Sequence, residues 1–267
     1  MIREVIKLTP FEDATLTPIC LSNTAELRQS PRRAVIVCPG GGYSGLAPHE
    51  ADPVAHRFLA AGFATFVLRY SVGENAKNFA PLCEVALAIK HVREHAEEYN
   101  VDPNYIFTLG FSAGGHLAGS AGVLWNIPEV KAVLGDAPEG INRPTGMILC
   151  YPVITAGEFA HKGSFHKLCG SKEATQEEMD RFSLEKHVDA TTAPAFLWHT
   201  QNDGGVPVQN SLLLVDAMTR AGVSAELHMY PDGPHGLGLC EDSKSAGAAH
   251  CKGWIDLAIK WAQDLQA

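Results

Sequence analysis

One serine lies between small residues at the junction of two sequence patterns, in the stretch G-F-S-A-G at residues 110–114. The preceding residues 105–109 are mostly apolar, β-branched or aromatic, which is typical of a buried strand. Residues 115–121 fit the start of a helix. A strand, a tight turn and a helix form a nucleophile elbow, whose strained turn presents a serine hydroxyl at the carboxyl edge of a sheet. The bare pattern is weak, but its position favours Ser112 as a nucleophile.

Apolar runs and helical patterns alternate along the rest of the chain. Strands are predicted at residues 34–38, 64–68, 105–109, 147–151, 195–198 and 225–230. Helices are predicted at residues 50–61, 82–92, 211–221 and 254–265. Because strands that alternate with helices form a mostly parallel sheet covered on both faces, we expect an α/β fold with its site at the carboxyl ends of the strands.

Residues 155–191 interrupt this alternation, because they contain no clear strand and mix glycine, histidine and helix-forming residues. The segment is too long for a simple connection. We therefore expect a single domain over residues 1–267, in which the sixth core strand is followed by a small, partly helical cap at 155–191.

Composition limits the classes of partner. The 267 residues are 46% hydrophobic and carry a formal net charge of −9, which argues against nucleic acid or an anionic membrane as the main partner. The first eight residues alternate and carry charge, unlike a secretory signal, and no apolar run is long enough to span a membrane. We expect a cytoplasmic protein. Seven cysteines without C-x-x-C spacing favour reduced thiols, and we expect no metal and no cofactor.

A serine hydroxyl is a poor nucleophile at neutral pH and needs a base and a group that orients the base. On a sheet with a nucleophile elbow, the chain order is serine, acid, histidine. Asp203 lies in the loop after the strand at 195–198, and His235 lies in a glycine- and proline-rich loop after the last predicted strand. These two side chains are the predicted partners of Ser112.

Other acids and histidines compete for these roles. Asp189 precedes its strand, which is the wrong end, and Asp232 is expected to shape the turn before the histidine. His116 is too close to Ser112 in the chain to be its base, so we expect a supporting role. His199 and His228 fall in strands and have a structural explanation.

The stretch P-G-G-G-Y at residues 39–43 follows the first central strand. Three glycines allow backbone N–H groups to turn toward an oxyanion, and the N–H of Ala113 at the helix start is a further donor. A flexible loop and a phosphate cradle are alternatives. A phosphate loop would end in lysine and serine or threonine, whereas the chain continues S-G-L-A.

Four motifs carry a family resemblance: P-G-G-G-Y at 39–43, G-F-S-A-G-G-H-L-A at 110–118, Y-P-V-I at 151–154 and P-H-G at 234–236. From about residue 30 to the C-terminus, including 158–163, the chain resembles the α/β-hydrolase family. It is most similar to the bacterial acetylxylan esterase-like branch, a carbohydrate esterase branch related to hormone-sensitive-lipase-type esterases.

The resemblance implies an α/β-hydrolase fold with a Ser112–His235–Asp203 triad. It also implies oxyanion donors at Gly41, Gly42 and Ala113. One departure is Pro39, which replaces the histidine of the lipase-type H-G-G-G pattern. Because of it, the N–H of Tyr43 could replace that of Gly41.

The main functional hypothesis is a serine esterase that removes short acyl groups, acetyl above all, from small sugars such as xylo-oligosaccharides. A formamidase or amidase, or a small peptidase of the prolyl type, would use the same triad, although no large accessory domain is present for the peptidase. A non-catalytic binding protein is a further alternative, but no triad member is missing. A glycosidase is disfavoured because no motif supplies a pair of carboxylates.

Substrate contacts are predicted less sharply. Tyr43 and Glu50 follow the glycine loop and could face the substrate, although Glu50 could also cap its helix. Phe159 and His161 could line a pocket, or could equally form the small core that holds the cap down.

Overall fold

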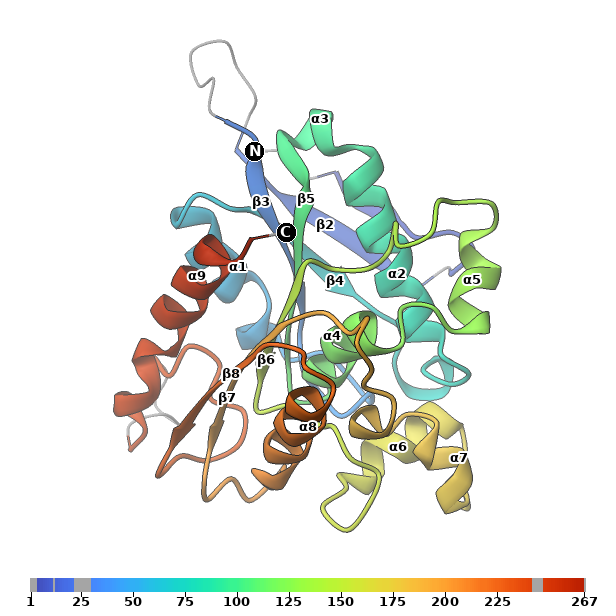
Figure 1. The fold of residues 1–267 in the computed structure, drawn as a ribbon, viewed down its shortest axis with the longest axis vertical. Helices are drawn as coiled ribbons and strands as arrows, with labels where there is room; N and C mark the ends of the chain where they lie inside the picture. Colours follow the sequence, from blue (N-terminus) through green and yellow to red (C-terminus); the bar gives the residue numbers. More distant parts are fainter. Residues whose placement is uncertain (1–3, 12, 22–29, 242–246, 267) are drawn as a thin grey trace.

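The computed structural model describes residues 4–11, 13–21, 30–241 and 247–266, and it contains one central sheet (Figure 1). Eight strands follow the order β1-β2-β4-β3-β5-β6-β7-β8, in which β3 to β8 run parallel and β1 and β2 are antiparallel. The strands are β1 (Ile6–Lys7), β2 (Thr15–Ile19), β3 (Arg32–Cys38), β4 (Ala64–Arg69), β5 (Val101–Phe111), β6 (Gly146–Cys150), β7 (Ala195–Thr200) and β8 (Ala225–Tyr230). The predicted α/β class with a mostly parallel sheet is therefore confirmed.

Every predicted strand is present. The apolar runs of β3 to β7 fill positions covered on both faces of the sheet, whereas β8 is an edge strand without a buried residue. The residues of β6 and β7 are all buried. Two strands were not predicted, namely β1 and β2 at the antiparallel edge. Pro18 in β2 weakens the sequence signal, since proline cannot donate to a ladder and is confined to edge strands or bulges.

Two groups of helices cover the two faces of the sheet (Figure 1). Helices α1 (Asp52–Ala60) and α9 (Trp254–Asp264) cover one face, where the Trp254 and Trp198 rings stack with centroids 5.3 Å apart. Helices α2 (Ala80–Glu94), α4 (Ala113–Val123) and α8 (Gln209–Arg220) cover the other. The remaining short helices outside 155–191 are η2 (Pro48–Glu50), η3 (Gly73–Asn75), α3 (Ala96–Tyr99), α5 (Pro128–Leu134) and η6 (Ala249–Gly253).

One helix prediction needs correction. The segment predicted as one helix at 50–61 is divided into η2 and α1, with Ala51 between them at φ −103° and ψ −107°. Pro53 explains the break, because proline has no N–H and is tolerated only in the first turn of a helix. Glu50 therefore ends η2 instead of capping α1.

Residues 155–191 contain α6 (Lys162–Cys169), α7 (Gln176–Asp180) and η4 (Leu184–Lys186). The Phe182 ring packs against the Phe79 ring with centroids 4.4 Å apart, which holds the segment on the body of the protein. The amide of Leu184 donates to the carbonyl of Ile154 at the start of the segment. None of the helices in the described ranges combines the length and apolar character needed to cross a lipid bilayer.

Candidate active site

Ser112 occupies a strained turn between β5 and α4. Its backbone lies at φ 52° and ψ −118°, a region that residues with a side chain rarely adopt. Two hydrogen bonds hold it there: its N–H donates to the carbonyl of Cys150 at 3.0 Å, and its carbonyl accepts from the N–H of Val153 at 3.0 Å. The neighbouring strand β6 and the residues after it therefore fix the serine in place.

The glycines of the elbow are required by space. A Cβ on Gly110 would overlap the backbone of Gly114, and a Cβ on Gly114 would overlap the carbonyls of Cys38 and Pro39. The close approach of β3 to the start of α4 leaves no room for a side chain. The spacing of the motif thus follows from how tightly the turn is packed.

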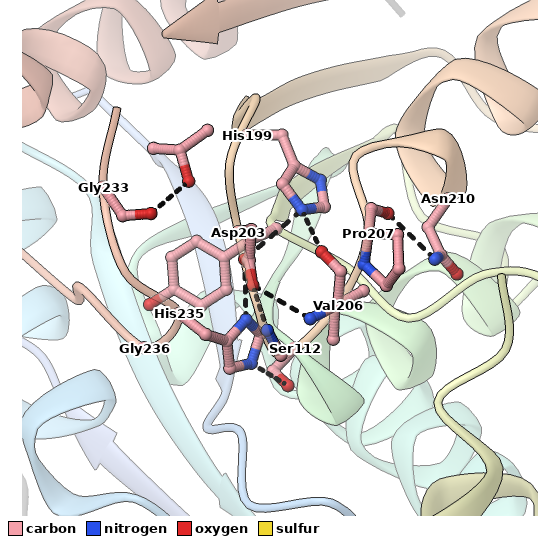
Figure 2. A network of polar contacts seen from close by, with 12 residues as sticks. Ser112, His199, Asp203, Val206, Pro207, Asn210, Gly233, His235 and Gly236 are labelled. Carbon is pink, nitrogen blue, oxygen red and sulfur yellow. Dashed lines mark hydrogen bonds and ion pairs between the residues drawn. The ribbon is translucent and has the colours of Figure 1, made fainter. Parts of the chain in front are cut away.

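Ser112, His235 and Asp203 form a chain of hydrogen bonds (Figure 2). His235 Nε2 lies 2.8 Å from Ser112 Oγ, and His235 Nδ1 lies 2.8 Å from Asp203 Oδ2. Asp203 follows β7 and His235 follows β8, so all three residues meet at the carboxyl edge of the sheet. Because a carboxylate only accepts, Nδ1 carries the ring proton and Nε2 is left to accept the proton of Ser112.

The carboxylate of Asp203 is buried, with its side chain only 1% exposed. Its Oδ1 accepts the N–H groups of Gly205 at 2.8 Å and Val206 at 2.9 Å. Burial opposes its ionisation, but hydrogen bonds from His199 and His235, the charge of His235 and the Val206 amide outweigh burial. Together they hold the pKa of Asp203 well below its usual value. Asp203 is therefore ionised at neutral pH.

His199 is a neighbour of the acid that the sequence did not suggest. Its Nε2 lies 2.9 Å from the carbonyl of Val206 and 3.4 Å from Asp203 Oδ2 (Figure 2). Its Nδ1 lies 2.8 Å from Ser211 Oγ. Since a carbonyl only accepts, the proton is on Nε2 and is directed at the acid loop. The sequence feature that could have indicated this contact is the position of His199 near the end of β7, four residues before Asp203.

Asp189 and Asp232, the alternative candidates for the catalytic acid, form hydrogen bonds with other residues. Asp232 Oδ1 accepts from Asn202 Nδ2 at 3.1 Å, and Asp189 Oδ1 accepts from the amide and the hydroxyl of Thr191 at 2.7 Å each. Asp189 thus shapes its own turn, whereas Asp232 connects the loop after β8 to the loop after β7.

The glycine loop after β3 presents unpaired donors. In the described part of the chain, the N–H groups of Gly41, Gly42 and Ala113 have no protein acceptor. The N–H of Gly40 differs, because it donates to Glu50 Oε2 at 2.8 Å. Gly41 has φ 134°, and a Cβ there would overlap the carbonyl of Gly45, so the loop also depends on glycine for its shape.

Tyr43 and His116 lie behind this loop. The Tyr43 side chain is 1% exposed and its hydroxyl lies 2.8 Å from His116 Nδ1. His116 Nε2 donates to the carbonyl of Phe182 at 2.7 Å, so the histidine connects the glycine loop with the 155–191 segment. Burial lowers the pKa of His116 to about 4, and the ring is neutral at pH 7. The phenol of Tyr43 therefore packs in the interior.

The other predicted substrate contacts lie in different surroundings. Glu50 is 2% exposed, and Tyr151 Oη donates to its Oε1 at 2.6 Å, so its carboxyl faces the interior. Phe159 is half-buried and its carbonyl accepts from Asn210 Nδ2 at 2.9 Å. His161 is half-buried beside the glycine loop, since a Cβ on Gly42 would lie 3.6 Å from its Cε1. Burial and the charge of His235 lower the pKa of His161.

A family model and known relatives show which family the chain belongs to. The model of the family described as BD-FAE matches residues 23–218. The chain belongs to the BD-FAE family. This BD-FAE chain is 36% identical over 81% of its length to endo-1,4-beta-xylanase B of Butyrivibrio fibrisolvens, covering 34% of that protein. It is 32% identical over 78% of its length to the acetylxylan esterase of Xylanibacter ruminicola, covering 41% of that protein.

The BD-FAE chain thus spans about a third to two fifths of the length of these curated relatives. Among solved structures, it is similar to an acetyl ester-xyloside bifunctional hydrolase from Caldicellulosiruptor lactoaceticus. The TM-score is 0.84 and the identity 37%, with 97% of this chain and 95% of that chain covered. These similarities assign the BD-FAE chain to an esterase-like branch of the α/β-hydrolases. Among its described residues, no group of three or more histidine, cysteine or acidic side chains is arranged to hold a metal ion.

Proposed function

We propose that this chain is a serine carboxylesterase that removes short acyl groups, acetyl above all, from small carbohydrates such as xylo-oligosaccharides. The observation that carries the proposal is the continuous hydrogen-bonded chain from Ser112 through His235 to Asp203, with 2.8 Å at each step. The printed names of two relatives, an acetylxylan esterase and an acetyl ester-xyloside hydrolase, support an acetylated sugar as substrate.

In the acylation step, His235 Nε2 takes the hydroxyl proton of Ser112 as Oγ attacks the ester carbonyl. The carbonyl oxygen becomes an oxyanion, which the free N–H groups of Gly41, Gly42 and Ala113 are available to bind. His235 then returns the proton to the alcohol oxygen, the C–O bond of the ester breaks, and an acyl-serine remains.

In the deacylation step, water donates a proton to His235 Nε2 and attacks the acyl-serine. The second tetrahedral intermediate collapses when His235 protonates Ser112 Oγ, which releases the carboxylic acid and restores the enzyme. Asp203 stays ionised throughout and stabilises the imidazolium that forms in each step, as expected from the lowered pKa of its carboxyl.

The alcohol part of the substrate has room beside the glycine loop. A cleft of about 220 Å³ is lined by Ser44, Gly163, His166 and Lys167, which follow Gly42 and His161 closely in the chain. The hydroxyl, imidazole and ammonium groups of Ser44, His166 and Lys167 can form hydrogen bonds with a hydroxylated sugar. We therefore assign the carbohydrate to this cleft.

An amidase and a glycosidase are the two alternative activities for this site. An amidase would share the acyl-serine chemistry, so the residues alone separate it poorly from an esterase. A glycosidase needs two carboxylates exposed to the sugar. Asp203 and Glu50 are 8% and 2% exposed and are both already hydrogen-bonded, which argues against that role.

The test compares the wild type with Ser112→Ala on p-nitrophenyl acetate, butyrate and octanoate, on acetylated xylo-oligosaccharides, on an N-formyl amide and on p-nitrophenyl xyloside. Ser120→Ala is the matched control, since Ser120 is a buried serine of α4 whose hydroxyl donates to the carbonyl of His116. We expect acetyl esters to be preferred, and Ser112→Ala to lose at least ~10³-fold in kcat. Faster turnover of the amide or the xyloside, or full activity of Ser112→Ala, would contradict the proposal.

A further inference from the structure

Glu50 is a buried carboxyl group that no lysine or arginine of the described residues neutralises. Among the described residues, the one basic side chain within 4.0 Å is His49, whose Nε2 lies 3.8 Å from Glu50 Oε1. A glutamate is rarely buried without a partner, because loss of hydration is costly. Here two donors compensate: the N–H of Gly40 at 2.8 Å from Oε2 and the hydroxyl of Tyr151 at 2.6 Å from Oε1.

Tyr151 extends this contact to the loop that carries the histidine. Its hydroxyl donates to Glu50 and accepts the N–H of Gly238 at 2.8 Å. Burial, together with the neighbouring Glu50, raises the pKa of Tyr151 well above its usual value, so the hydroxyl keeps the proton that it donates. The Tyr151 ring also packs edge-on against the His235 ring, with centroids 5.1 Å apart.

His49 adds a second connection to the same loop. Its Nε2 donates to the carbonyl of Gly236 at 3.0 Å, and a Cβ on Gly238 would lie 2.9 Å from its Cδ2. Residues 49 and 50 therefore contact both the oxyanion loop, defined here as 40–43, and the histidine loop, defined as 235–238. These two loops follow different strands, β3 and β8, which are separated by three strands in the sheet.

We propose that Glu50 and Tyr151 are positioning residues that fix the oxyanion loop and the histidine loop relative to each other. The path runs from the N–H of Gly40 through Glu50 and Tyr151 to the N–H of Gly238. In this arrangement the oxyanion donors and the His235 ring keep the same relative positions while His235 accepts and returns a proton in acylation and in deacylation. The catalytic consequence rests on the proposed function, whereas the mechanical connection does not.

Two substitutions break the path at different points. Tyr151→Phe keeps the ring against His235 but leaves Glu50 Oε1 and the N–H of Gly238 without their shared partner. Glu50→Gln keeps the shape, and its amide oxygen can still accept from Gly40, but its NH₂ group cannot accept the proton of Tyr151. Tyr99→Phe is the matched control, because it removes a buried hydroxyl that lies 3.0 Å from His91 Nε2, next to α2.

The first measurement is residue-resolved amide exchange in the wild type and the three variants. The proposal predicts a reciprocal effect: Glu50→Gln accelerates exchange at Gly238, and Tyr151→Phe accelerates exchange at Gly40, each by about tenfold or more. In each case the affected amide is the one that does not bond to the substituted side chain. Tyr99→Phe leaves both amides unchanged while lowering the unfolding midpoint to a similar extent.

The second measurement is turnover of p-nitrophenyl acetate. We expect kcat to fall roughly 10- to 100-fold in Glu50→Gln and Tyr151→Phe, with KM within about threefold, since small misplacements of catalytic groups have effects of this size. The double variant should lose no more than the worse single variant, because both substitutions interrupt one path. The affinity for a trifluoromethyl ketone, which forms an oxyanion on Ser112, should fall in parallel with kcat.

Several results would overturn the proposal: unchanged exchange at the remote amide, additive losses in the double variant, or wild-type kcat despite faster exchange. If the wild type hydrolyses no acyl ester, the proposed function fails, and exchange at Gly40 and Gly238 still decides whether the two loops are connected. In that case the rate at which a fluorophosphonate labels Ser112 replaces kcat as the measure of positioning.

Discussion

His199 Nε2 lies 3.4 Å from Oδ2 of Asp203, and both side chains are almost completely excluded from solvent. The histidine therefore belongs to the surroundings that keep the Asp203 carboxylate ionised, and its own hydrogen bonds go to Ser211 and Val206. This contact links the end of β7 to the loop that follows it.

His199→Phe should weaken both stability and catalysis. A hydrogen bond to a charged group contributes roughly 2 kcal/mol, so we expect a loss of this size in the free energy of unfolding at pH 7, and about a tenfold lower kcat/KM. His228→Phe is the control, since His228 lies in β8 and its ring lies 2.7 Å from Glu226 Oε1. Urea unfolding and ester turnover measure the two effects, and an unchanged kcat/KM would contradict the assignment.

The pH dependence of this effect has a definite sign. The pKa of Asp203 is lower in the folded protein than its ordinary value of 3.8. Its stabilising contribution is therefore fully present above pH 3.8 and is lost as the pH falls through the folded pKa. The stability difference between the wild type and His199→Phe should shrink below about pH 4, and a constant difference would count against this origin.

Gly114→Ala should be among the most damaging small substitutions in the chain, because the new Cβ would overlap backbone carbonyls that cannot move independently. We expect a loss of at least ~3 kcal/mol in the free energy of unfolding, or failure to fold. Gly253→Ala is the control, since nothing lies within 4 Å of a Cβ there and its φ is −70°. Thermal unfolding of the two variants gives the comparison, and equal midpoints would contradict the packing described.

Glu84 should make stability depend on pH. This carboxyl in α2 is fully buried and accepts from the amide and the hydroxyl of Ser71. Burial raises its pKa from 4.5 to about 7, so the folded state holds a proton that the unfolded state has released between these values. Its contribution to stability is therefore fully present below pH 4.5 and is lost as the pH rises to about 7.

The raised pKa of Glu84 corresponds to a change of up to about 3 kcal/mol in the free energy of unfolding. Glu84→Gln should remove this part of the pH dependence of stability. Urea unfolding at pH 5 and pH 8 tests it, with Glu94→Gln on the exposed side of the same helix as the control. A pH dependence that is the same in Glu84→Gln and the wild type would show that another group is responsible.

His161 should affect the carbohydrate more than the acyl group. It lies beside Gly42 at the edge of the proposed sugar cleft, and burial and the charge of His235 lower its pKa, so it is neutral at pH 7. We expect His161→Ala to raise KM for acetylated xylo-oligosaccharides about five- to tenfold and to leave kcat for p-nitrophenyl acetate within about threefold. His187→Ala, an exposed histidine of the same segment, should change neither value. Equal effects on both substrates would contradict this assignment.

Much of the fold followed from patterns that act over a few residues. The apolar runs of β3 to β7 predicted most of the sheet because parallel strands are buried on both faces, and the alternating pattern of residues 225–230 predicted β8. The positions of Ser112, Asp203 and His235 after β5, β7 and β8 predicted that they would meet at one edge of the sheet, and the structure brings them together. The catalytic roles of these residues remain predictions.

Other features depend on contacts that no local pattern specifies. Glu50 and Tyr151 are 101 positions apart, and nothing near either residue indicates that a carboxyl and a phenol share a buried hydrogen bond. The strand β2 was missed because Pro18 is unfavourable in most strands and tolerated here only through its place near the sheet edge.

The backbone of Ser112 has one more consequence. A residue held at positive φ and ψ −118° costs of order 1–3 kcal/mol, and glycine would remove most of that strain. At the position of the proposed nucleophile, a substitution that deletes the serine hydroxyl is therefore expected to raise the stability of the fold. Directed evolution for heat resistance alone would favour inactive sequences at this site, so screens on this scaffold need to select for turnover at every round.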